Sequence, residues 1–561
     1  MTTSGVETPP YVMIASGQGE ALVQRLIERL TESPGDAGAR YLLFAALASC
    51  GRHAEARAAL DQARLLHGLL TIKAWDGDIE RLQRDADYAA AVGLRLYNAG
   101  NVAVACVALT AAVQAGCNDP STLLTHALSL QHQGRADEAV EAFRAVGARF
   151  PTPGVTQFLL TAMFAANDGV RRHAAEARAW AAKYAPSRPA APFANSRAPG
   201  RPIRVGYVSP NFAQNQARQF IAPLFDHHDR NRFTVFAFPN QPEDAANWAA
   251  PLEIRPIGAL GDDAAAELIR RERIDILIDC WGHAAGSRLP VFARRPAPIQ
   301  ASWLNYQQTS GIAAIDYVIQ TDVVDGPEVA ELFVEQVWRM GDACAAFRPD
   351  PGPRGSPAPC LATGRVTFGA FVNPAKLSEL SVAMWSRILA ARPTARLVLK
   401  YAYFIDPVLQ AVTQSRFLAH GVNPGQIEFR GRTSGAAYQA EFAEIDLALD
   451  PSPCPGGTTS LEALSRGVPV LTLLGDSFYA RLGASVVGPA GFPDLVAPSP
   501  DAYVAKALEL SEDPRRMQAL RDRVGPGFDA APFRDEVGMT RRIEAVYRSM
   551  FTRWCETAQA A

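Results

Sequence analysis

The sequence lacks the features that mark a membrane, secreted or nucleic-acid-binding protein. The formal net charge of its 561 residues is only −2, and without an excess of basic residues no electrostatic field favours nucleic acid or an anionic membrane. No apolar run approaches the roughly 20 residues of a membrane span, and the first residues do not show a basic stretch followed by an apolar one. We therefore expect a cytoplasmic protein with no membrane span and no nucleic-acid partner.

Cysteine is scarce, and patterns that bind metals are missing. The eight cysteines are scattered without a CxxC pair, which fits free thiols in a reducing compartment better than disulfides or a zinc site. A divalent ion on a diphosphate would need paired carboxylates beside a strand, but the DxD matches, Asp76–Asp78 and Asp85–Asp87, lie in a part of the chain with a helical pattern. We expect no metal and no bound cofactor.

The N-terminal third is rich in alanine and leucine and is self-similar between residues 38 and 185. The similarity shows in four glycines that each precede an alanine by five residues: Gly51, Gly100, Gly134 and Gly169. The last two spacings, 34 and 35 residues, match the tetratricopeptide repeat, whose stacked helix pairs present a concave surface to a peptide or a partner protein. The first spacing is 49 residues, so 66–86 holds either an insertion or a degenerate unit. A plain helical bundle is the alternative.

The rest of the chain alternates short apolar runs with helical patterns, which is typical of parallel βαβ units. With 48% hydrophobic residues the chain has material for several cores. The predicted strands are 203–210, 233–238, 274–280, 299–304 and 316–320 in one set, and 366–372, 395–400, 427–429, 446–450 and 468–473 in another. Two doubly wound lobes in series predict a ligand cleft at the carboxyl ends of their strands.

Two linkers rich in proline divide the chain. The predicted division is an N-terminal segment (1–37), helical repeats (38–185), a linker (186–202), a first lobe (203–346), a linker (347–364), a second, nucleotide-binding lobe (365–535) and a C-terminal helix (536–561). The C-terminal helix is amphipathic and should pack back across the lobes. Because a linker joins the repeats to the lobes, we expect nucleotide binding to survive deletion of the repeats.

The stretch Leu447–Leu464 has the residue types of a phosphate-binding turn. An apolar run of strand character is followed by a proline-rich loop, and Gly456-Gly457-Thr458-Thr459 then opens a helix. Glycines let an anion approach the backbone, and the first N–H groups of a helix have no intrahelical partner. Glu462 lies one turn further on, where it can accept hydrogen bonds from sugar hydroxyls. The stretch predicts a pyrophosphate site, and an ordinary capped helix after a βα loop is the alternative.

Three blocks resemble one family of enzymes in the same order along the chain. Arg295–Ile319, Phe368–Leu389 and Pro455–Ser485 resemble the O-GlcNAc transferase family of glycosyltransferases, which couples tetratricopeptide repeats to a GT-B catalytic region. The resemblance implies an α-helical repeat solenoid followed by an α/β GT-B fold of two Rossmann-like lobes. It also implies a metal-independent, inverting transfer of a sugar from a nucleotide donor to Ser or Thr of a protein acceptor, which would dock on the groove of the repeats.

Three side chains are candidates for the chemistry. Lys376 follows a predicted strand of the second lobe, and the resemblance implies that its ammonium faces the diphosphate; a surface lysine is the alternative. His283 lies at the end of a predicted strand of the first lobe, where ligands of α/β folds collect, and could touch donor or acceptor as a general base. Asn215 stands where the family usually has a histidine near the reacting centre, which puts a simple copy of the mechanism in doubt.

Further candidates for donor binding follow the fourth strand of the first lobe. There the family usually reads WLGYPGT, whereas this chain has Trp303-Leu304 and then Asn305, Tyr306, Gln307, Gln308 and Thr309. Thr309, Ser310 and Gly311 are expected to open the next helix. Arg481 could face the same cleft, although a surface arginine fits equally well.

These departures place extra amides near the sugar. Asn215, Asn305, Gln307 and Gln308 each add a hydrogen-bond donor and an acceptor, so we predict a donor other than UDP-N-acetylglucosamine, for example an acidic nine-carbon sugar carried on CMP. Flagellin glycosyltransferases share this layout, which makes flagellin the acceptor to test. The alternatives are a UDP-N-acetylglucosamine-dependent transferase of broad specificity, a repeat scaffold with an inactive catalytic region, and a transferase acting on a lipid or small glycoside.

Overall fold

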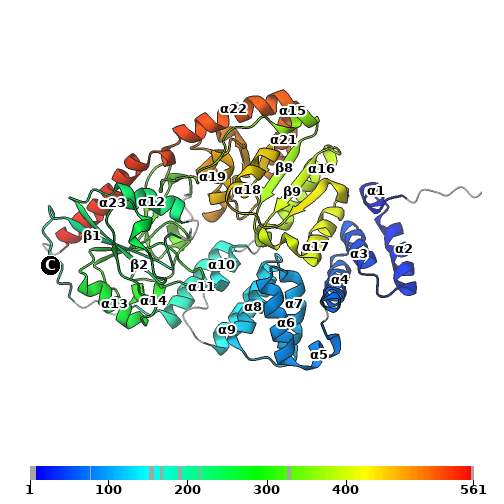
Figure 1. The fold of residues 1–561 in the computed structure, drawn as a ribbon, viewed down its shortest axis with the longest axis horizontal. Helices are drawn as coiled ribbons and strands as arrows, with labels where there is room; N and C mark the ends of the chain where they lie inside the picture. The colour runs from blue at the N-terminus through cyan, green and yellow to red at the C-terminus, as the bar shows by residue number, and fades with distance from the viewer. Residues whose placement is uncertain are drawn as a thin grey trace, which may run out of the picture.

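The computed structural model describes residues 8–75, 77–150, 157–164, 169–187, 192–213, 217–306, 308–324 and 330–557. A helical N-terminal part lies beside two α/β lobes, each built on a parallel sheet (Figure 1). The predicted fold class, a helical repeat region followed by a GT-B-like pair of Rossmann-like lobes, is confirmed. Within the described residues no helix is both long and apolar enough to cross a bilayer.

Antiparallel helix pairs make up the N-terminal part, with α3 against α4, α6 against α7 and α8 against α9. Four of the helices are capped by an aspartate side chain that accepts a backbone N–H, namely Asp36, Asp78, Asp85 and Asp119. The many alanines stabilise the interiors of the helices because alanine has the highest helix propensity. The helices are α1 (Pro10–Ala15), α2 (Gly19–Glu32), α3 (Ala37–Ser49), α4 (His53–Ala74), α5 (Ile79–Arg84), α6 (Ala86–Asn98), α7 (Val102–Gln114), α8 (Pro120–Gln131), α9 (Ala136–Arg149), α10 (Gln157–Ala162) and α11 (Gly169–Tyr184).

Three of the aligned glycines form the turns inside these pairs. Gly51, Gly100 and Gly134 have φ of +76°, +86° and +75°, a left-handed conformation that residues with a side chain rarely adopt. The long spacing between the first two has a simple cause: α4 runs for 22 residues and the six-residue α5 follows it. The segment 66–86 therefore holds the end of a long helix and an added short one. Gly169 differs, because it begins α11 rather than a turn.

The last two helices of this part pack into the core of the first lobe. Leu159 of α10 and Ala177 and Trp180 of α11 are buried in one cluster with Phe236, a residue of the first lobe. The approach is close: a Cβ on Gly311 would lie 2.3 Å from the Ala177 carbonyl oxygen. The helices that pack on the first lobe therefore come before the proline-rich linker in the sequence.

A seven-stranded parallel sheet forms the first lobe, in the order β3-β2-β1-β4-β5-β6-β7. Its strands are β1 (Ile203–Ser209), β2 (Phe233–Pro239), β3 (Glu253–Ile254), β4 (Ile276–Asp279), β5 (Ile299–Ser302), β6 (Tyr317–Gln320) and β7 (Gln336–Arg339), with helices α12 (Arg218–His227), α13 (Asp262–Arg271) and α14 (Leu289–Ala293). The five predicted strands are present, and the short edge strands β3 and β7 were not predicted.

The second lobe has a six-stranded parallel sheet in the order β10-β9-β8-β11-β12-β13. Its strands are β8 (Thr367–Phe371), β9 (Arg396–Lys400), β10 (Ile427–Arg430), β11 (Leu447–Leu449), β12 (Val470–Leu473) and β13 (Val496–Ala497). Its helices are α15 (Pro359–Thr363), α16 (Glu379–Ala391), α17 (Pro407–Leu418), α18 (Gly435–Glu441), α19 (Thr458–Ser465), α20 (Ala484–Val487), α21 (Pro500–Leu510) and α22 (Pro514–Ala530). Only the two-residue β13 was not predicted.

Residues 309–311 do not open a helix, contrary to the prediction. The chain between β5 and β6 is irregular there, because side chains compete for the backbone. The Thr309 hydroxyl donates to Glu335 (2.7 Å) and the Ser310 N–H donates to the same carboxylate (2.8 Å). Polar groups that bind a buried carboxylate hold the segment in place without helical hydrogen bonds.

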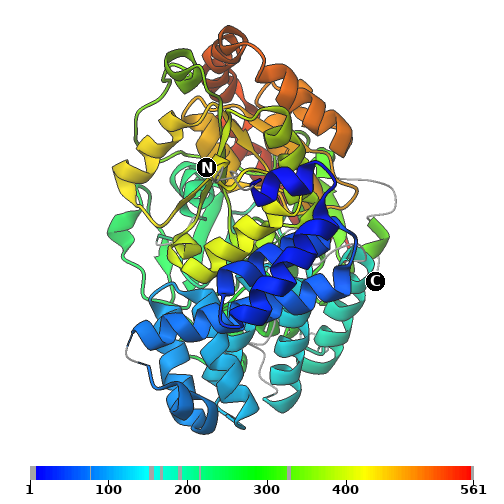
Figure 2. The same cartoon turned by 90° about the vertical axis from the view of Figure 1, so that its right-hand side faces the viewer.

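The helical part shares a core with the second lobe. Leu22, Ala46 and Leu47 are buried in one cluster with Leu418 of α17, and Figure 2 shows the first helices, in blue, beside the yellow helices of that lobe. One carboxylate joins the two parts: Asp406 caps its own helix α17 through Val408 and Leu409 and also accepts from Ala103 N (2.6 Å) and Val104 N (3.2 Å) of α7. This shared packing argues against the expectation that the repeats can be deleted without loss of nucleotide binding.

The C-terminal helix α23 (Glu536–Glu556) returns from the second lobe to the first, as expected, and packs on α12 (Figure 1). Its buried Glu544 accepts from the Asp229 N–H (2.7 Å) and lies 3.1 Å from His228 Nδ1. Tyr207 completes the contact, with its hydroxyl 2.8 Å from His228 Nε2 and 3.2 Å from the Tyr547 hydroxyl. This buried polar cluster fastens α23 to the first lobe.

The cluster predicts how stability depends on pH. Burial raises the pKa of Glu544, but hydrogen bonds from His228, Asp229 and Arg541 outweigh it and lower the pKa to about 2. A depressed carboxyl pKa adds stability above the unfolded-state value and loses it as the pH falls through the folded value. Glu544→Gln, which cannot ionise, should therefore have a lower thermal midpoint than the wild type at pH 6, with the gap narrowing from about pH 4.5 downward. A gap that stays constant down to pH 3 would contradict this role of Glu544.

Candidate active site

A cavity of about 1090 Å³ opens between the two lobes and the helical part. The second lobe supplies most of its wall, from the carboxyl ends of β8, β9 and β11 and from the start of α19. The first lobe contributes Trp281, Leu304 and Asn305, and the turn before α7 contributes Asn98 and Gly100. The cavity thus lies where ligands of doubly wound folds bind, at the carboxyl ends of parallel strands.

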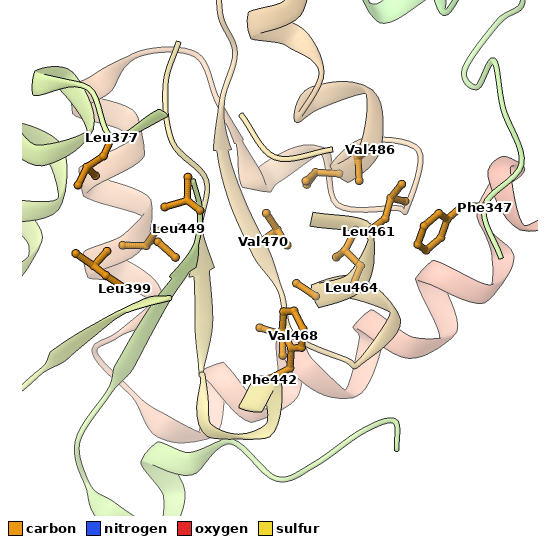
Figure 3. Close-up of a cluster of buried hydrophobic side chains, with 14 of the residues drawn as sticks. Phe347, Leu377, Leu399, Phe442, Leu449, Leu461, Leu464, Val468, Val470 and Val486 are labelled. Carbon is orange, nitrogen blue, oxygen red and sulfur yellow. The ribbon is translucent and has the colours of Figure 1, made fainter. Parts of the chain in front are cut away.

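The packing of α19 on the sheet sets the position of the predicted phosphate-binding turn. Leu461 and Leu464 of α19 are buried in the cluster around Leu449 of β11 and Val470 of β12 (Figure 3). The N-terminal end of α19 faces the cavity, together with the two residues before it: Gly456, Gly457, Thr458 and Thr459 line the cavity. No side chain caps α19, and its first intrahelical bond runs from the Leu461 N–H to the Gly457 carbonyl. The preceding N–H groups of the helix therefore point toward the cavity with their partial positive charge.

Asp450 lies beneath this turn and holds its shape. Its Oδ1 accepts from the Gly456 N–H (2.7 Å) and from the Ser460 hydroxyl (3.1 Å). Burial raises the pKa of Asp450 to about 6, against these hydrogen bonds and the charge of Lys376, which lower it. The Gly456 N–H is therefore used by Asp450, and the groups left for an anion are those of the first turn of α19.

Gly456 is the glycine of this turn that cannot carry a side chain. A Cβ there would lie 2.4 Å from the Ser460 hydroxyl and 2.8 Å from Asp450 Oδ1, whereas a Cβ on Gly457 would meet only the side chain of Leu482, at 3.1 Å. We expect Gly456→Ala to weaken binding of whichever nucleotide the wild type binds, UDP or CMP, at least about 10-fold, because the added methyl group overlaps these side chains and displaces the turn. Gly457→Ala, with a flexible neighbour, is the matched control. Equal affinities of both variants, measured by calorimetry, would contradict this.

Lys376 lies in the cavity beside the same turn. It ends a short 3₁₀ turn, Pro374–Lys376, that follows β8, and its Nζ donates to the Pro455 carbonyl at 2.9 Å. The structure therefore brings Lys376 together with Gly456–Thr459, residues that are about 80 positions apart in the sequence. An ammonium and a helix N-terminus in one cavity form an electropositive site for phosphate oxygens.

Glu462 also lines the cavity, next to residues that the sequence analysis missed. Its Oε2 accepts from the Tyr438 hydroxyl (2.8 Å), and burial raises its pKa. Lys400, at the end of β9, lies against the ring faces of Phe371 and Tyr438 and donates to Glu441 (2.8 Å). Lys400 could have been found by a rule like the one that led to Lys376, because it ends a predicted strand and Lys376 comes shortly after one.

Several predicted residues do not line the cavity. The His283 side chain is fully buried with its ring edge-on to Trp180 and Tyr306, and its Nε2 donates to the Ser310 carbonyl at 2.8 Å. Burial lowers its pKa to about 4. The position expected for a general base is therefore occupied by a neutral, structural histidine.

The remaining candidates have similar structural partners. The Tyr306 hydroxyl hydrogen bonds with His173, Thr309 binds Glu335, Gln308 is buried, and Arg481 Nε donates to the Gly475 carbonyl (2.9 Å). Of the described donor-binding candidates after β5, Asn305 is the one that borders the cavity. Asn215 and Gln307 lie outside the described residues.

The DxD matches have structural roles. Asp78 accepts from the Arg81 N–H and Asp85 from the Tyr88 N–H, each as the cap of a helix, while Asp76 lies outside the described residues. Across the described ranges no group of three or more His, Cys, Asp or Glu side chains could hold a metal ion.

Comparison with known proteins agrees with this geometry. The model of the family "Glycosyl transferase family 41" matches residues 186–345 and 360–532. The chain belongs to glycosyl transferase family 41. A solved structure, that of a mutant form of the Thermobaculum terrenum O-GlcNAc transferase, superposes with a TM-score of 0.77 at 27% identity and covers 96% of this chain and 99% of that one.

Curated relatives of this family-41 chain are longer proteins. It is 32% identical over 379 residues to the probable UDP-N-acetylglucosamine–peptide N-acetylglucosaminyltransferase SPINDLY of Solanum lycopersicum, which covers 64% of this chain and 40% of the relative. The Caenorhabditis elegans UDP-N-acetylglucosamine–peptide N-acetylglucosaminyltransferase is 24% identical over 450 residues, with 58% and 38% covered. The chain thus spans about 40% of the length of the curated relatives it matches.

Proposed function

We propose that this family-41 chain transfers a sugar from a nucleotide donor to a Ser or Thr hydroxyl of a protein acceptor. The observation that carries the proposal is the cavity in which Lys376 and the uncapped start of α19 lie together, with a turn of the helical part at its rim. A cationic site for phosphates beside a peptide-binding array fits a protein glycosyltransferase. It does not fit a transferase for lipids or small glycosides, which has no use for such an array.

The proposed reaction is an inverting displacement without a metal ion. The acceptor hydroxyl attacks the anomeric carbon on the face opposite the departing phosphate, so the bond from that carbon to the phosphate oxygen breaks as the new glycosidic bond forms. The proton of the hydroxyl passes to water. The negative charge that develops on the phosphate is stabilised by the Lys376 ammonium and the first N–H groups of α19. Glu462 accepts from the ribose hydroxyls.

The acceptor would reach the cavity along the helical part. Asn98 and Gly100, between α6 and α7, border the cavity together with Lys376. A peptide bound to the repeats would therefore lie next to the reacting centre. Flagellin is the acceptor that we propose to test first.

For the donor we propose a CMP-linked nonulosonic acid rather than UDP-N-acetylglucosamine, the sugar nucleotide in the names of the relatives. Support comes from Asn305, which borders the cavity from the first lobe and carries an amide where the family usually has glycine. A polar side chain there favours a sugar with more hydrogen-bonding groups.

A side-by-side transfer assay on purified flagellin tests both parts of the proposal. We expect intact-mass spectra to show the increment of a nonulosonic acid with the CMP donor, and at least about 10-fold slower transfer of N-acetylglucosamine from UDP. Efficient turnover of the UDP sugar alone would refute the donor assignment and leave the enzyme assignment standing. Absence of transfer and of nucleotide release with either donor would favour a scaffold with an inactive catalytic region.

A further inference from the structure

The loop that carries Lys376 lies close to the helical part. This loop, Asn373–Ser378, is called the Lys376 loop below. Gly134, in the turn between α8 and α9, faces its backbone: a Cβ built on Gly134 would lie 3.4 Å from the Pro374 carbonyl oxygen and 3.9 Å from that of Leu377. Because Gly134 has only a hydrogen atom in place of a side chain, the α8–α9 turn can lie close to the backbone of the Lys376 loop. A side chain that extends beyond Cβ would push the turn and the loop apart.

A second path joins the same loop to the helical part through α17. Arg416 of α17 donates to the Leu377 carbonyl at 2.8 Å. The same helix packs on α3, α4 and α7, and its cap Asp406 accepts from the Ala103 N–H of α7. The carbonyl of Leu377 is therefore bound by a side chain from a helix that itself packs on the repeats.

On its other side the Lys376 loop is tied to the phosphate-binding turn. Lys376 Nζ donates to the Pro455 carbonyl at 2.9 Å. The Ser378 hydroxyl donates to the Ser452 carbonyl, and the Ser452 N–H donates to the Ser381 hydroxyl at 2.9 Å. The loop thus lies between the repeats and the turn that faces the cavity, with polar contacts on the cavity side and close packing on the other.

We propose that Gly134 is a positioning residue of the donor site. Because its backbone comes so close to the Pro374 and Leu377 carbonyls, the α8–α9 turn fixes the Lys376 loop and with it the ammonium that meets the departing phosphate. The helical part then serves the chemical step as well as acceptor binding, and turnover of donor in the absence of any protein acceptor depends on it. The effect of Gly134 on kcat rests on the proposed function, whereas its effect on the position of the Lys376 loop does not.

Gly51 offers a matched control for Gly134. Its φ of +76° equals that of Gly134 within a degree, and both turns have the same hydrogen bonds, from the glycine N–H to the carbonyl three residues back and from the following N–H to the carbonyl five residues back. A Cβ on Gly51 would meet nothing within 4 Å. Gly51→Leu and Gly134→Leu therefore carry the same backbone strain of a left-handed residue and differ only in what the side chain meets.

The test compares the two leucine variants by kinetics and by hydrogen exchange. For Gly134→Leu we expect kcat for nucleotide release from whichever of UDP-N-acetylglucosamine and CMP-nonulosonic acid the wild type hydrolyses, without acceptor, to fall roughly 10- to 100-fold, since a misplacement of about 1 Å has that effect. KM should change less, because the Lys376 contact matters most in the transition state. Gly51→Leu should keep the kcat of the wild type at a similar thermal midpoint.

Hydrogen exchange reports on the loop independently of catalysis. The N–H groups of Lys376 and Leu377 bind Asn373 O (2.8 Å) and Pro374 O (3.0 Å), so their exchange should accelerate in Gly134→Leu and stay as in the wild type in Gly51→Leu. Gly134→Ala, whose Cβ fits at ordinary contact distance, should lie between. Equal exchange at these two N–H groups in both leucine variants would overturn the inference. If the wild type releases nucleotide from neither donor, with or without flagellin, the proposed function fails, and the exchange measurement still decides the role of Gly134.

Discussion

Replacing Lys376 with alanine should lower sugar transfer about 100- to 1,000-fold while the protein stays folded. Loss of one preformed donor to a developing negative charge has an effect of this size, and Lys376 is the ammonium that reaches the phosphate-binding turn. The side chain lies at the cavity wall rather than in the apolar core, so its removal leaves no large void. Single-turnover transfer rates with saturating donor provide the measurement.

Lys506→Ala is the control for this experiment. Lys506 forms a partly exposed ion pair with Glu509 in α21, and ion pairs near the surface contribute little to stability, so turnover should equal that of the wild type. A Lys376→Ala variant that keeps more than about a third of the wild-type rate would remove Lys376 from the reaction.

Replacing Asp406 with alanine should destabilise the whole chain by about 2–4 kcal/mol, because two helices lose their cap and buried N–H groups of α7 and α17 lose their partner. The carboxylate is fully buried and accepts from Ala103, Val104, Val408 and Leu409. Thermal and denaturant unfolding followed by circular dichroism would show a large drop in the midpoint.

An ordinary cap provides the comparison. Asp513 caps α22 on the surface through the Arg515 N–H, and Asp513→Ala should cost only about 1 kcal/mol. If Asp406→Ala shifts the midpoint no more than Asp513→Ala, then the contact between the helical part and the second lobe is not a main source of stability, and the repeats are more separable than their packing indicates.

Features that depend on local sequence could be predicted. The parallel strands were visible as short β-branched runs because both faces of such a sheet are covered. The start of α19 at Gly456–Thr459 could be predicted because glycines and threonines follow a strand and a proline-rich loop, and Lys376 could be singled out because it follows a strand and lies in a block that resembles the family. The shortest strands, β3 and β13 with two residues each, left too little pattern to recognise.

Features that depend on contacts between distant segments could not be predicted. His283 does lie just beyond a strand, but Trp180, about 100 residues earlier, covers its ring. Thr309 is held by Glu335, 26 residues later. The joint at Asp406 gave no sign in the sequence, since an aspartate before a proline at the start of a helix looks like any other cap. In each case the partner comes from another element, and periodicity carries no information about it.

The intact masses of proteins from three cell lines test the proposed activity most directly. One line lacks this chain, one carries the wild type and one carries Lys376→Ala. If the chain is a protein glycosyltransferase whose site includes Lys376, at least one protein, with flagellin the first to examine, gains the mass of one or more sugar residues only in cells with the wild type. Identical masses in all three lines, or the same gain with Lys376→Ala as with the wild type, would contradict it.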